Sequence, residues 1–209
     1  MKAKFIYFIL LSTITLSGTL TAQASTANQK TIANLQDAFT GETTASAKYA
    51  AYAKKAREEG HDKIGLMFEA ASKAESIHAG NHKSVLLQLG GNVPEVNPEF
   101  EVKATNANLE DALKGESYEI STMYPDFIKA AQKEQVNLAL ISLNYAYQTE
   151  KKHQALYTKA IQALKDGAEN TLSDVYAVCS TCGNTYDSEA PARCGISMTP
   201  KERFINFSL

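Results

Sequence analysis

The feature that most constrains the fold of this chain is a short pattern that occurs twice. It is a glutamate followed three residues later by a histidine. The copies are Glu75 with His78 and Glu150 with His153. Residues three apart lie on the same face of an α-helix, so each pair can present a carboxylate and an imidazole to one metal ion. A single such pair is usually part of a solvated helix surface. Two of the 4 histidines carry it here, and this repetition favours a metal site.

Two further glutamates complete a regular arrangement. Glu42 and Glu116 each follow a glycine, and the intervals Glu42 to Glu75 and Glu116 to Glu150 differ by one residue. The chain therefore reads as two helical hairpins, each with a lone glutamate and then Glu-x-x-His. Ferritin-like di-iron four-helix bundles take their ligands from this combination of helices.

Four helices are expected where apolar residues recur at helical spacing, over residues 28–59, 61–89, 106–133 and 136–164. Residues 92–103 contain two prolines and are expected to form a long connection between the hairpins. A long connection at this place predicts a mainly α, ferritin-like bundle with one long crossover. Pro125 lies inside the third predicted helix and should kink it.

The burial of charge gives the physical basis for a metal site. Glu75 and His78 lie on the same stripe as Ile64 and Met67, and a buried charge is costly unless it is paired or coordinated. Glu119 is one turn beyond Glu116. Two iron ions would neutralise these carboxylates, and oxygen and imidazole ligands suit iron or manganese. The candidate ligands are Glu42, Glu75, His78, Glu116, Glu119, Glu150 and His153.

The chain begins with a predicted secretory signal peptide, residues 1–24. Two lysines precede an apolar stretch over residues 5–16, and Ala22-Gln23-Ala24 has the small-x-small form of a cleavage site. The protein is therefore expected to be exported to the periplasm and to keep no stable membrane anchor. An uncleaved membrane anchor is the alternative. The net charge of −2 and the lack of a basic stripe argue against nucleic-acid binding.

After a bundle over residues 25–166, residues 171–209 are expected to form a small metal-knuckle domain. Cys179, Cys182 and Gly183 have the spacing of a metal-binding turn, and Cys194 offers a third thiolate for iron or zinc. Ser197 stands where a fourth thiolate belongs, which should weaken the site. A Cys179–Cys182 disulfide, with Cys194 left over, is the alternative.

Together these segments resemble the rubrerythrin family over residues 30–207, including a rubredoxin-like tail. The segments that carry the resemblance are residues 34–42, Glu75 to His78, 115–119, Glu150 to His153, 184–186 and 189–191. The resemblance implies that Glu75 and Glu150 bridge two irons. It further implies that Glu42, Glu119 and His78 serve one iron, with Glu119 and His78 exchanging as the oxidation state changes, and that Glu116 and His153 serve the other. Tyr49 and Tyr124 match tyrosines that hydrogen-bond ligand carboxylates, although simple packing is an open alternative.

The function expected from this resemblance is a non-haem di-iron peroxidase that reduces hydrogen peroxide to water in oxidative-stress defence. Electrons would come through or around the tail from a donor protein, either a rubredoxin or an NADH-dependent reductase. A head-to-tail homodimer would bring the tail of one chain near the irons of the other. The alternatives are a ferritin-type iron-binding ferroxidase, a di-manganese catalase-like enzyme, and a tail that holds zinc only as a structural element.

Overall fold

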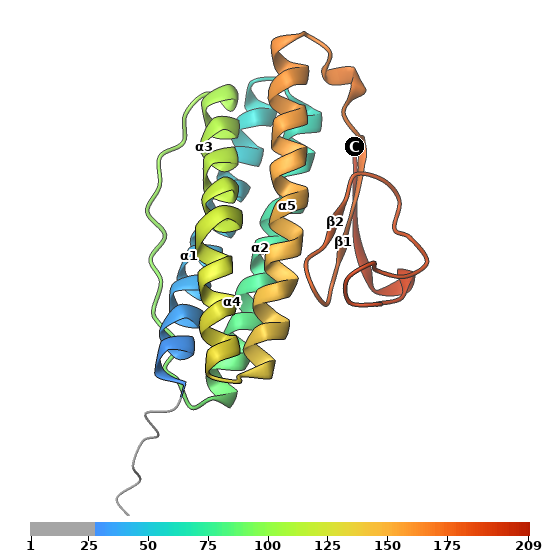
Figure 1. Cartoon of the computed structure of the whole chain (residues 1–209). Helices are drawn as coiled ribbons and strands as arrows, with labels where there is room; N and C mark the ends of the chain where they lie inside the picture. Colours follow the sequence, from blue (N-terminus) through green and yellow to red (C-terminus); the bar gives the residue numbers. More distant parts are fainter. Residues whose placement is uncertain (1–27) are drawn as a thin grey trace, which may run out of the picture.

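The computed structural model describes residues 28–209, so the predicted signal peptide lies outside the described residues. A bundle of helices fills most of this part, and a small sheet lies beside it (Figure 1). The helices are α1 (Gln29–Glu58), α2 (Asp62–Gln88), α3 (Thr105–Tyr118), α4 (Tyr124–Lys133) and α5 (Asn137–Lys165). The predicted ferritin-like bundle is confirmed. No helix among these residues combines the length and the apolar character needed to cross a bilayer.

The two hairpins are α1 with α2 and α3–α4 with α5, and the chain between α2 and α3 runs along the outside of the bundle (Figure 1). This is the long crossover that the two prolines indicated. Glycines with positive φ follow α1 and α2, Gly60 at 85° and Gly90 at 73°. Such residues end helices because glycine adopts the left-handed conformation without a steric penalty.

The third predicted helix, over residues 106–133, is not continuous, and in this respect the prediction is wrong. A π-helical segment, Glu119–Met123, separates α3 from α4, and Pro125 is in the first turn of α4. Proline has no N–H to donate and its ring crowds the carbonyl four residues earlier, so the disturbance falls before the proline. The wider turn therefore coincides with the candidate ligand Glu119, and π-helical turns are frequent at functional sites.

Apolar clusters lie on both sides of the candidate ligands. One contains Tyr49, Phe68 and Tyr157, and the other contains Tyr124 and Leu143. The glutamates and histidines of the two hairpins are no more than 2% exposed; they are Glu42, Glu75, His78, Glu116, Glu150 and His153. The bundle thus encloses a polar layer between two apolar ones, which keeps bulk water away from it.

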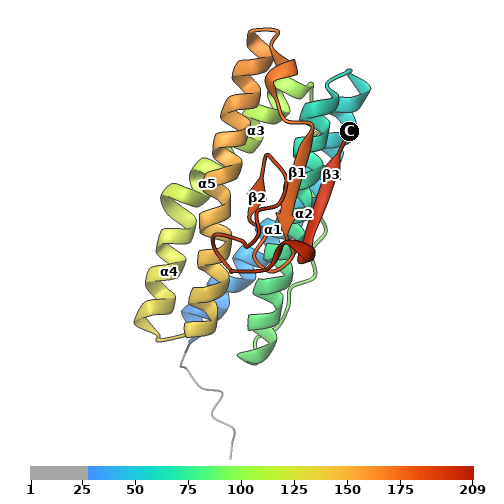
Figure 2. The same cartoon turned by 90° about the vertical axis from the view of Figure 1, so that its right-hand side faces the viewer.

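The tail forms a three-stranded antiparallel sheet in the order β2-β1-β3. Its strands are β1 (Val175–Cys179), β2 (Thr185–Tyr186) and β3 (Phe204–Ser208), and short 3₁₀ turns occupy Glu169–Thr171 and Lys201–Arg203. Seen from the side, the sheet lies across α2 and α5 rather than beyond the end of the bundle (Figure 2). A third cluster, around the cysteines, forms the core of this tail.

Candidate metal centres

The bundle brings six candidate ligands into two groups that share Glu75 and Glu150. One group adds Glu42 and His78, and the other adds Glu116 and His153. Within each group the ligand atoms all lie within 4.8 Å of one another. All four long helical segments contribute, because Glu42 is on α1 and Glu116 is on α3, while α2 and α5 each supply one Glu-x-x-His pair.

The two imidazoles face this cluster in the same way. His78 Nδ1 lies 2.9 Å from Glu75 Oε2 and 3.0 Å from Glu150 Oε1. His153 Nδ1 lies 2.9 Å from Glu150 Oε2 and 3.0 Å from Glu75 Oε1. Each shared carboxylate therefore directs one oxygen toward each histidine, which is the arrangement expected of a ligand that bridges two ions.

Several buried atoms of this cluster make no hydrogen bond of normal geometry, although they lie close to one another. They include Glu75 Oε1, both carboxylate oxygens of Glu150, and His153 Nδ1. A buried polar atom without a partner costs roughly 1–3 kcal/mol, and more when it is charged. Cations between these atoms would satisfy all of them at once, so the donor set fits a pair of metal ions of the iron or manganese type.

Burial and crowding shift the protonation of the carboxylates strongly. Burial raises the pKa of Glu42 to about 8, despite the opposing effect of His78. Burial and the neighbouring Glu150 raise the pKa of Glu116 well above its ordinary value. Burial alone would also raise the pKa of Glu75, but contacts with His153 and His78 outweigh it and bring that pKa to about 2. The metal-free cluster therefore retains protons that cations would displace.

The histidines hold protons in the metal-free cluster for the same reason. Burial lowers the pKa of His78, but Glu150 and Glu42 outweigh burial and raise that pKa well above its ordinary value. Burial likewise opposes protonation of His153, and Glu75 together with Glu150 raises its pKa. Metal ions and protons thus compete for the same buried atoms.

This competition predicts how the stability of the metal-free protein depends on pH. Above its ordinary pKa of 4.5, Glu42 is ionised in the unfolded chain but protonated in the folded one, up to about pH 8. His78 and His153 similarly keep protons that the unfolded chain releases above 6.5. The folded state binds more protons over this range, so the free energy of unfolding falls as the pH rises. The pKa of Glu75 is lowered to about 2, so this carboxylate changes the free energy of unfolding only in acid.

Melting temperatures measured without metal at about pH 5.5 and about pH 8 check this expectation. We expect a decrease of roughly 5 °C or more toward pH 8. Added ferrous or manganous ions should remove most of the decrease, because they replace the protons. A metal-free melting temperature that rises with pH would contradict the buried-carboxylate interpretation, and Glu42→Gln should show a smaller decrease than the wild type.

Two tyrosine hydroxyls hold the outer carboxylates. Tyr49 donates to Glu116 Oε1 over 2.8 Å, and Tyr124 donates to Glu42. Both tyrosines are buried, and burial followed by the nearby carboxylate raises the pKa of each well above its ordinary value. Both rings therefore remain protonated donors and restrict the orientation of Glu42 and Glu116.

Glu119 stands apart from the other candidate ligands. It belongs to neither group of converging ligand atoms, and its side chain is only partly buried on the π-helical segment. Burial and Glu42 raise its pKa well above the ordinary value. The structure thus places Glu119 beside the cluster rather than in it.

A buried histidine that the sequence pattern did not single out lies next to the cluster. His82 Nε2 is 3.3 Å from the Tyr124 hydroxyl, and its Nδ1 is 2.8 Å from Ser142 Oγ. Burial, followed by the charge of His78, lowers the pKa of His82 to about 3, so its ring is neutral. The available signal was its place one helical turn after His78. The remaining histidine, His61, pairs with Glu169 at the far end of α1.

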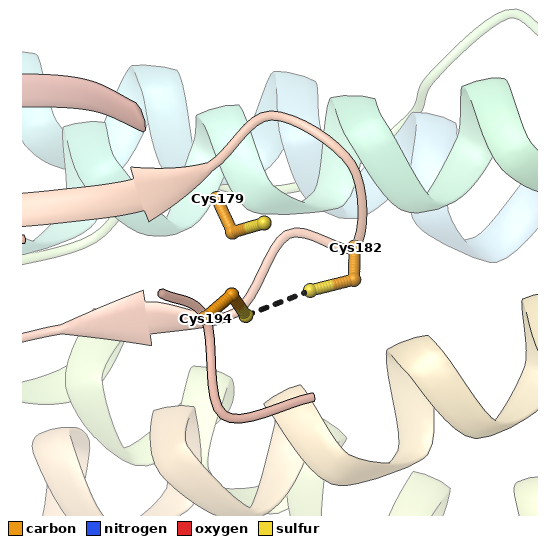
Figure 3. Close-up of side chains that lie close together, drawn as sticks. All are labelled: Cys179, Cys182 and Cys194. Carbon is orange, nitrogen blue, oxygen red and sulfur yellow. Dashed lines mark hydrogen bonds between the residues drawn. The ribbon is translucent and has the colours of Figure 1, made fainter. Parts of the chain in front are cut away.

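The tail brings Cys179, Cys182 and Cys194 together, as the sequence pattern suggested (Figure 3). All three are buried and free, so the alternative Cys179–Cys182 disulfide is not formed. The sulfur atoms of Cys182 and Cys194 are 3.5 Å apart. A hydrogen bond with Cys182 lowers the pKa of Cys179 to about 4, which favours a thiolate. Three converging sulfurs suggest a second metal site.

The tail touches the bundle through the same two histidines that face the carboxylates. His78 Nε2 lies 3.1 Å from the carbonyl oxygen of Cys182, and His153 Nε2 lies 3.0 Å from Thr185 Oγ1. Asn81 adds a hydrogen bond of 2.9 Å to the carbonyl of Thr181. These contacts are made within one chain, whereas the expected head-to-tail homodimer would bring the tail of one chain near the cluster of the other. The two candidate sites are thus linked through single imidazole rings.

The close approach of tail and bundle requires a residue without a side chain at Gly183. A Cβ atom there would lie 2.3 Å from His78 Nε2 and 3.1 Å from the carbonyl oxygen of Ala74. Gly183 also has φ of 78°, which a residue with a side chain rarely adopts. This glycine therefore serves both the turn that holds the cysteines and the docking on α2.

Comparisons with known proteins agree with this architecture. The family model described as rubrerythrin matches residues 33–161. Nigerythrin of Nitratidesulfovibrio vulgaris is 36% identical over 193 residues, covering 88% of this chain and 90% of its own length. Rubrerythrin-2 of Clostridium acetobutylicum is 30% identical over 184 residues, covering 88% and 100%.

Solved structures give the same result. The fully reduced, all-ferrous structure of nigerythrin superposes with a TM-score of 0.75 at 34% identity, covering 84% of this chain and 86% of that one. A bacterioferritin of Mycobacterium tuberculosis matches at 18% identity with a TM-score of 0.61, which shows a shared bundle fold alone. Because the family model spans more than half of the sequence and the relatives cover both the bundle and the tail, this chain belongs to the rubrerythrin family.

Proposed function

We propose that this protein is a non-haem di-iron peroxidase that reduces hydrogen peroxide to water. The overall reaction consumes one peroxide, two protons and two electrons and yields two waters. Two iron ions held in the cluster would supply the two electrons and the positive charge that stabilises the developing oxide. The proposal is supported by the membership of the rubrerythrin family and by the paired carboxylate–histidine groups.

Different residues of this chain would bind and orient the two ions of such a centre. Glu75 and Glu150 would bridge the ions, Glu42 with His78 would bind one, and Glu116 with His153 would bind the other. The hydroxyls of Tyr49 and Tyr124 fix the outer carboxylates. Glu119, on its wider helical turn and outside both groups of converging ligands, would join or leave the coordination of an ion bound by Glu42 and His78.

One observation favours electron transfer over iron storage, namely the thiol site that docks on the ligand histidines. His78 joins the carboxylate cluster to the Cys182 carbonyl through the two nitrogens of one ring. A peroxidase must be reduced again after each turnover, and this connection offers a path for that reduction. We infer that electrons from a donor protein, a rubredoxin or an NADH-dependent reductase, enter through the tail.

The contacts within one chain bear on the proposed head-to-tail homodimer. The tail reaches the cluster of its own chain, so a dimer is not needed to bring the two sites together. A dimer that exchanged tails would preserve the same hydrogen bonds between identical residues. The head-to-tail homodimer therefore stays a prediction.

A coupled assay of the iron-loaded full-length protein tests the function. With NADH, an NADH-dependent reductase and peroxide, we expect NADH to be consumed with one peroxide reduced per NADH and without oxygen evolution. His153→Ala should reduce turnover by at least about a hundredfold, because it removes an imidazole from the cluster. His61→Ala, a histidine in the loop between α1 and α2, is the matched control.

Other outcomes of the assay identify the rival functions. Oxygen release from peroxide without reductant would indicate a catalase-like reaction. Iron uptake far beyond two ions per bundle, with no NADH consumption, would indicate a ferritin-type ferroxidase. Either result would overturn the proposed peroxidase.

A further inference from the structure

The loop after Cys194 repeats the backbone of the loop after Cys179. In the first loop, the Cys179 amide donates to the Asn184 carbonyl over 3.0 Å and the Gly183 amide donates to the Cys179 carbonyl over 2.9 Å. In the second, the Cys194 amide donates to the Thr199 carbonyl over 2.8 Å and the Met198 amide donates to the Cys194 carbonyl over 3.0 Å. The same offsets in both loops define two equivalent metal-binding turns.

The second turn has the backbone hydrogen bonds of the first but a different sequence. Met198 occupies the position equivalent to Gly183 and has φ of 59°, against 78° for the glycine. A residue with a side chain rarely adopts this conformation, because its Cβ crowds the following carbonyl oxygen. The turn therefore persists at an energetic disadvantage, and it places Ser197 where the first turn has Cys182.

The hydroxyl of Ser197 points at the thiol cluster. Ser197 Oγ lies 3.2 Å from Cys179 Sγ, and the sulfurs of Cys182 and Cys194 are 3.5 Å apart. In a tetrahedral site with bonds of about 2.3 Å to sulfur and about 2.0 Å to oxygen, neighbouring ligand atoms lie about 3.5–3.8 Å apart. The two observed pairs are opposite edges of such a tetrahedron and lie close to this range.

Neighbouring groups hold the serine and the sulfurs in place. Thr199, which is buried, lies with its Oγ1 2.8 Å from Ser197 Oγ. The Ile196 amide donates to Cys194 Sγ over 3.5 Å, and Asn184 Nδ2 donates to the same sulfur over 3.7 Å. Hydrogen bonds from amides to sulfur are typical of the surroundings that orient metal ligands.

We propose that Ser197 Oγ is the fourth ligand of a metal ion bound by Cys179, Cys182 and Cys194. The tail is then a site of three sulfurs and one oxygen, rather than a three-coordinate site with a missing ligand. This ligand set does not depend on peroxide turnover in the bundle, so its test and the test of the proposed function can fail separately.

The oxygen ligand has a consequence for iron in the tail. Oxygen is a harder donor than sulfur and favours the smaller, more highly charged ferric ion over the ferrous ion. The reduction potential of tail iron in the wild type is therefore lower than in Ser197→Cys. The replacement of one sulfur by oxygen also weakens the sulfur-to-metal absorption and moves it to shorter wavelength.

Cobalt(II) loaded into the full-length protein tests the ligand set, because only thiolates give intense sulfur-to-cobalt bands and the cluster in the bundle contains no sulfur. We expect Ser197→Cys to intensify these bands and move them to longer wavelength. Ser197→Ala should weaken cobalt binding in the tail by about tenfold or more. Ser188→Ala, an exposed serine of the same tail, is the matched control and should match the wild type.

Two results of the cobalt experiment would overturn the proposal. One is a Ser197→Ala protein with the cobalt affinity and spectrum of the wild type. The other is a wild type that binds no cobalt in the tail after full thiol reduction. With iron in the tail, a potentiometric titration should place the midpoint of Ser197→Cys above that of the wild type, and equal midpoints would equally contradict an oxygen ligand. The Ser197→Cys comparison remains decisive if Ser197→Ala fails to fold.

Discussion

Glu150→Ala is expected to abolish binding of both iron ions in the bundle. Glu150 belongs to both groups of converging ligands, and its two oxygens lie 3.0 Å from His78 Nδ1 and 2.9 Å from His153 Nδ1. Removing it takes a ligand from each ion and leaves two buried imidazoles without their shared carboxylate. Peroxide turnover should fall by at least about a hundredfold.

Iron content per chain after anaerobic loading measures this effect directly. Glu58→Ala removes an exposed glutamate of α1 that pairs with Lys54 at 3.8 Å, and this variant should load iron as the wild type does. Glu150→Gln keeps the volume of the side chain but not its charge, and it should also lose iron while the bundle remains folded. Retention of two irons and full turnover by Glu150→Ala would refute the bridging role.

Gly183→Ala is expected to separate the tail from the bundle. The added Cβ would lie 2.3 Å from His78 Nε2, and the positive φ of Gly183 adds strain. Because the clash involves a ring held by carboxylates on its other side, we expect the tail to move. In protein loaded with iron at both sites, electron transfer from the reduced tail iron to the bundle should slow by at least about tenfold, since a displacement of about 1 Å at a reacting site can cost a hundredfold.

Stopped-flow oxidation of the reduced tail iron after peroxide addition measures this step. Gly195→Ala is the matched control, because its Cβ would meet only the Tyr186 hydroxyl at an ordinary 3.6 Å. Direct chemical reduction of the bundle irons distinguishes a lost route from a damaged centre and should stay unchanged in Gly183→Ala. A wild-type rate of tail oxidation in Gly183→Ala would show that the observed docking is not the route of electrons.

The bundle and most of its ligands could be predicted because the helical period of the apolar residues shows which side of each helix is buried. Glu75 and His78 share a stripe with Ile64 and Met67, so burial of the apolar residues dictates burial of the charged ones. The repeated interval then places Glu42 and Glu116 at the same level of the bundle. Local sequence therefore determines which side chains meet.

Features that depend on contacts between distant segments could not be predicted. The docking of the tail on its own α2 depends on how Gly183 meets His78, and no local period encodes that contact. The π-helical turn at Glu119 was missed because Pro125 indicates a disturbance of the helix but not its form. His82 was passed over because no glutamate precedes it at the spacing that identified the other ligands.

A crystal structure of the iron-loaded protein, with anomalous scattering measured at the iron absorption edge, tests the central claim most directly. We predict two iron peaks between Glu75 and Glu150, roughly 3.5–4 Å apart, one next to His78 and one next to His153. A single peak, no peak, or iron bound only to exposed carboxylates would contradict the account.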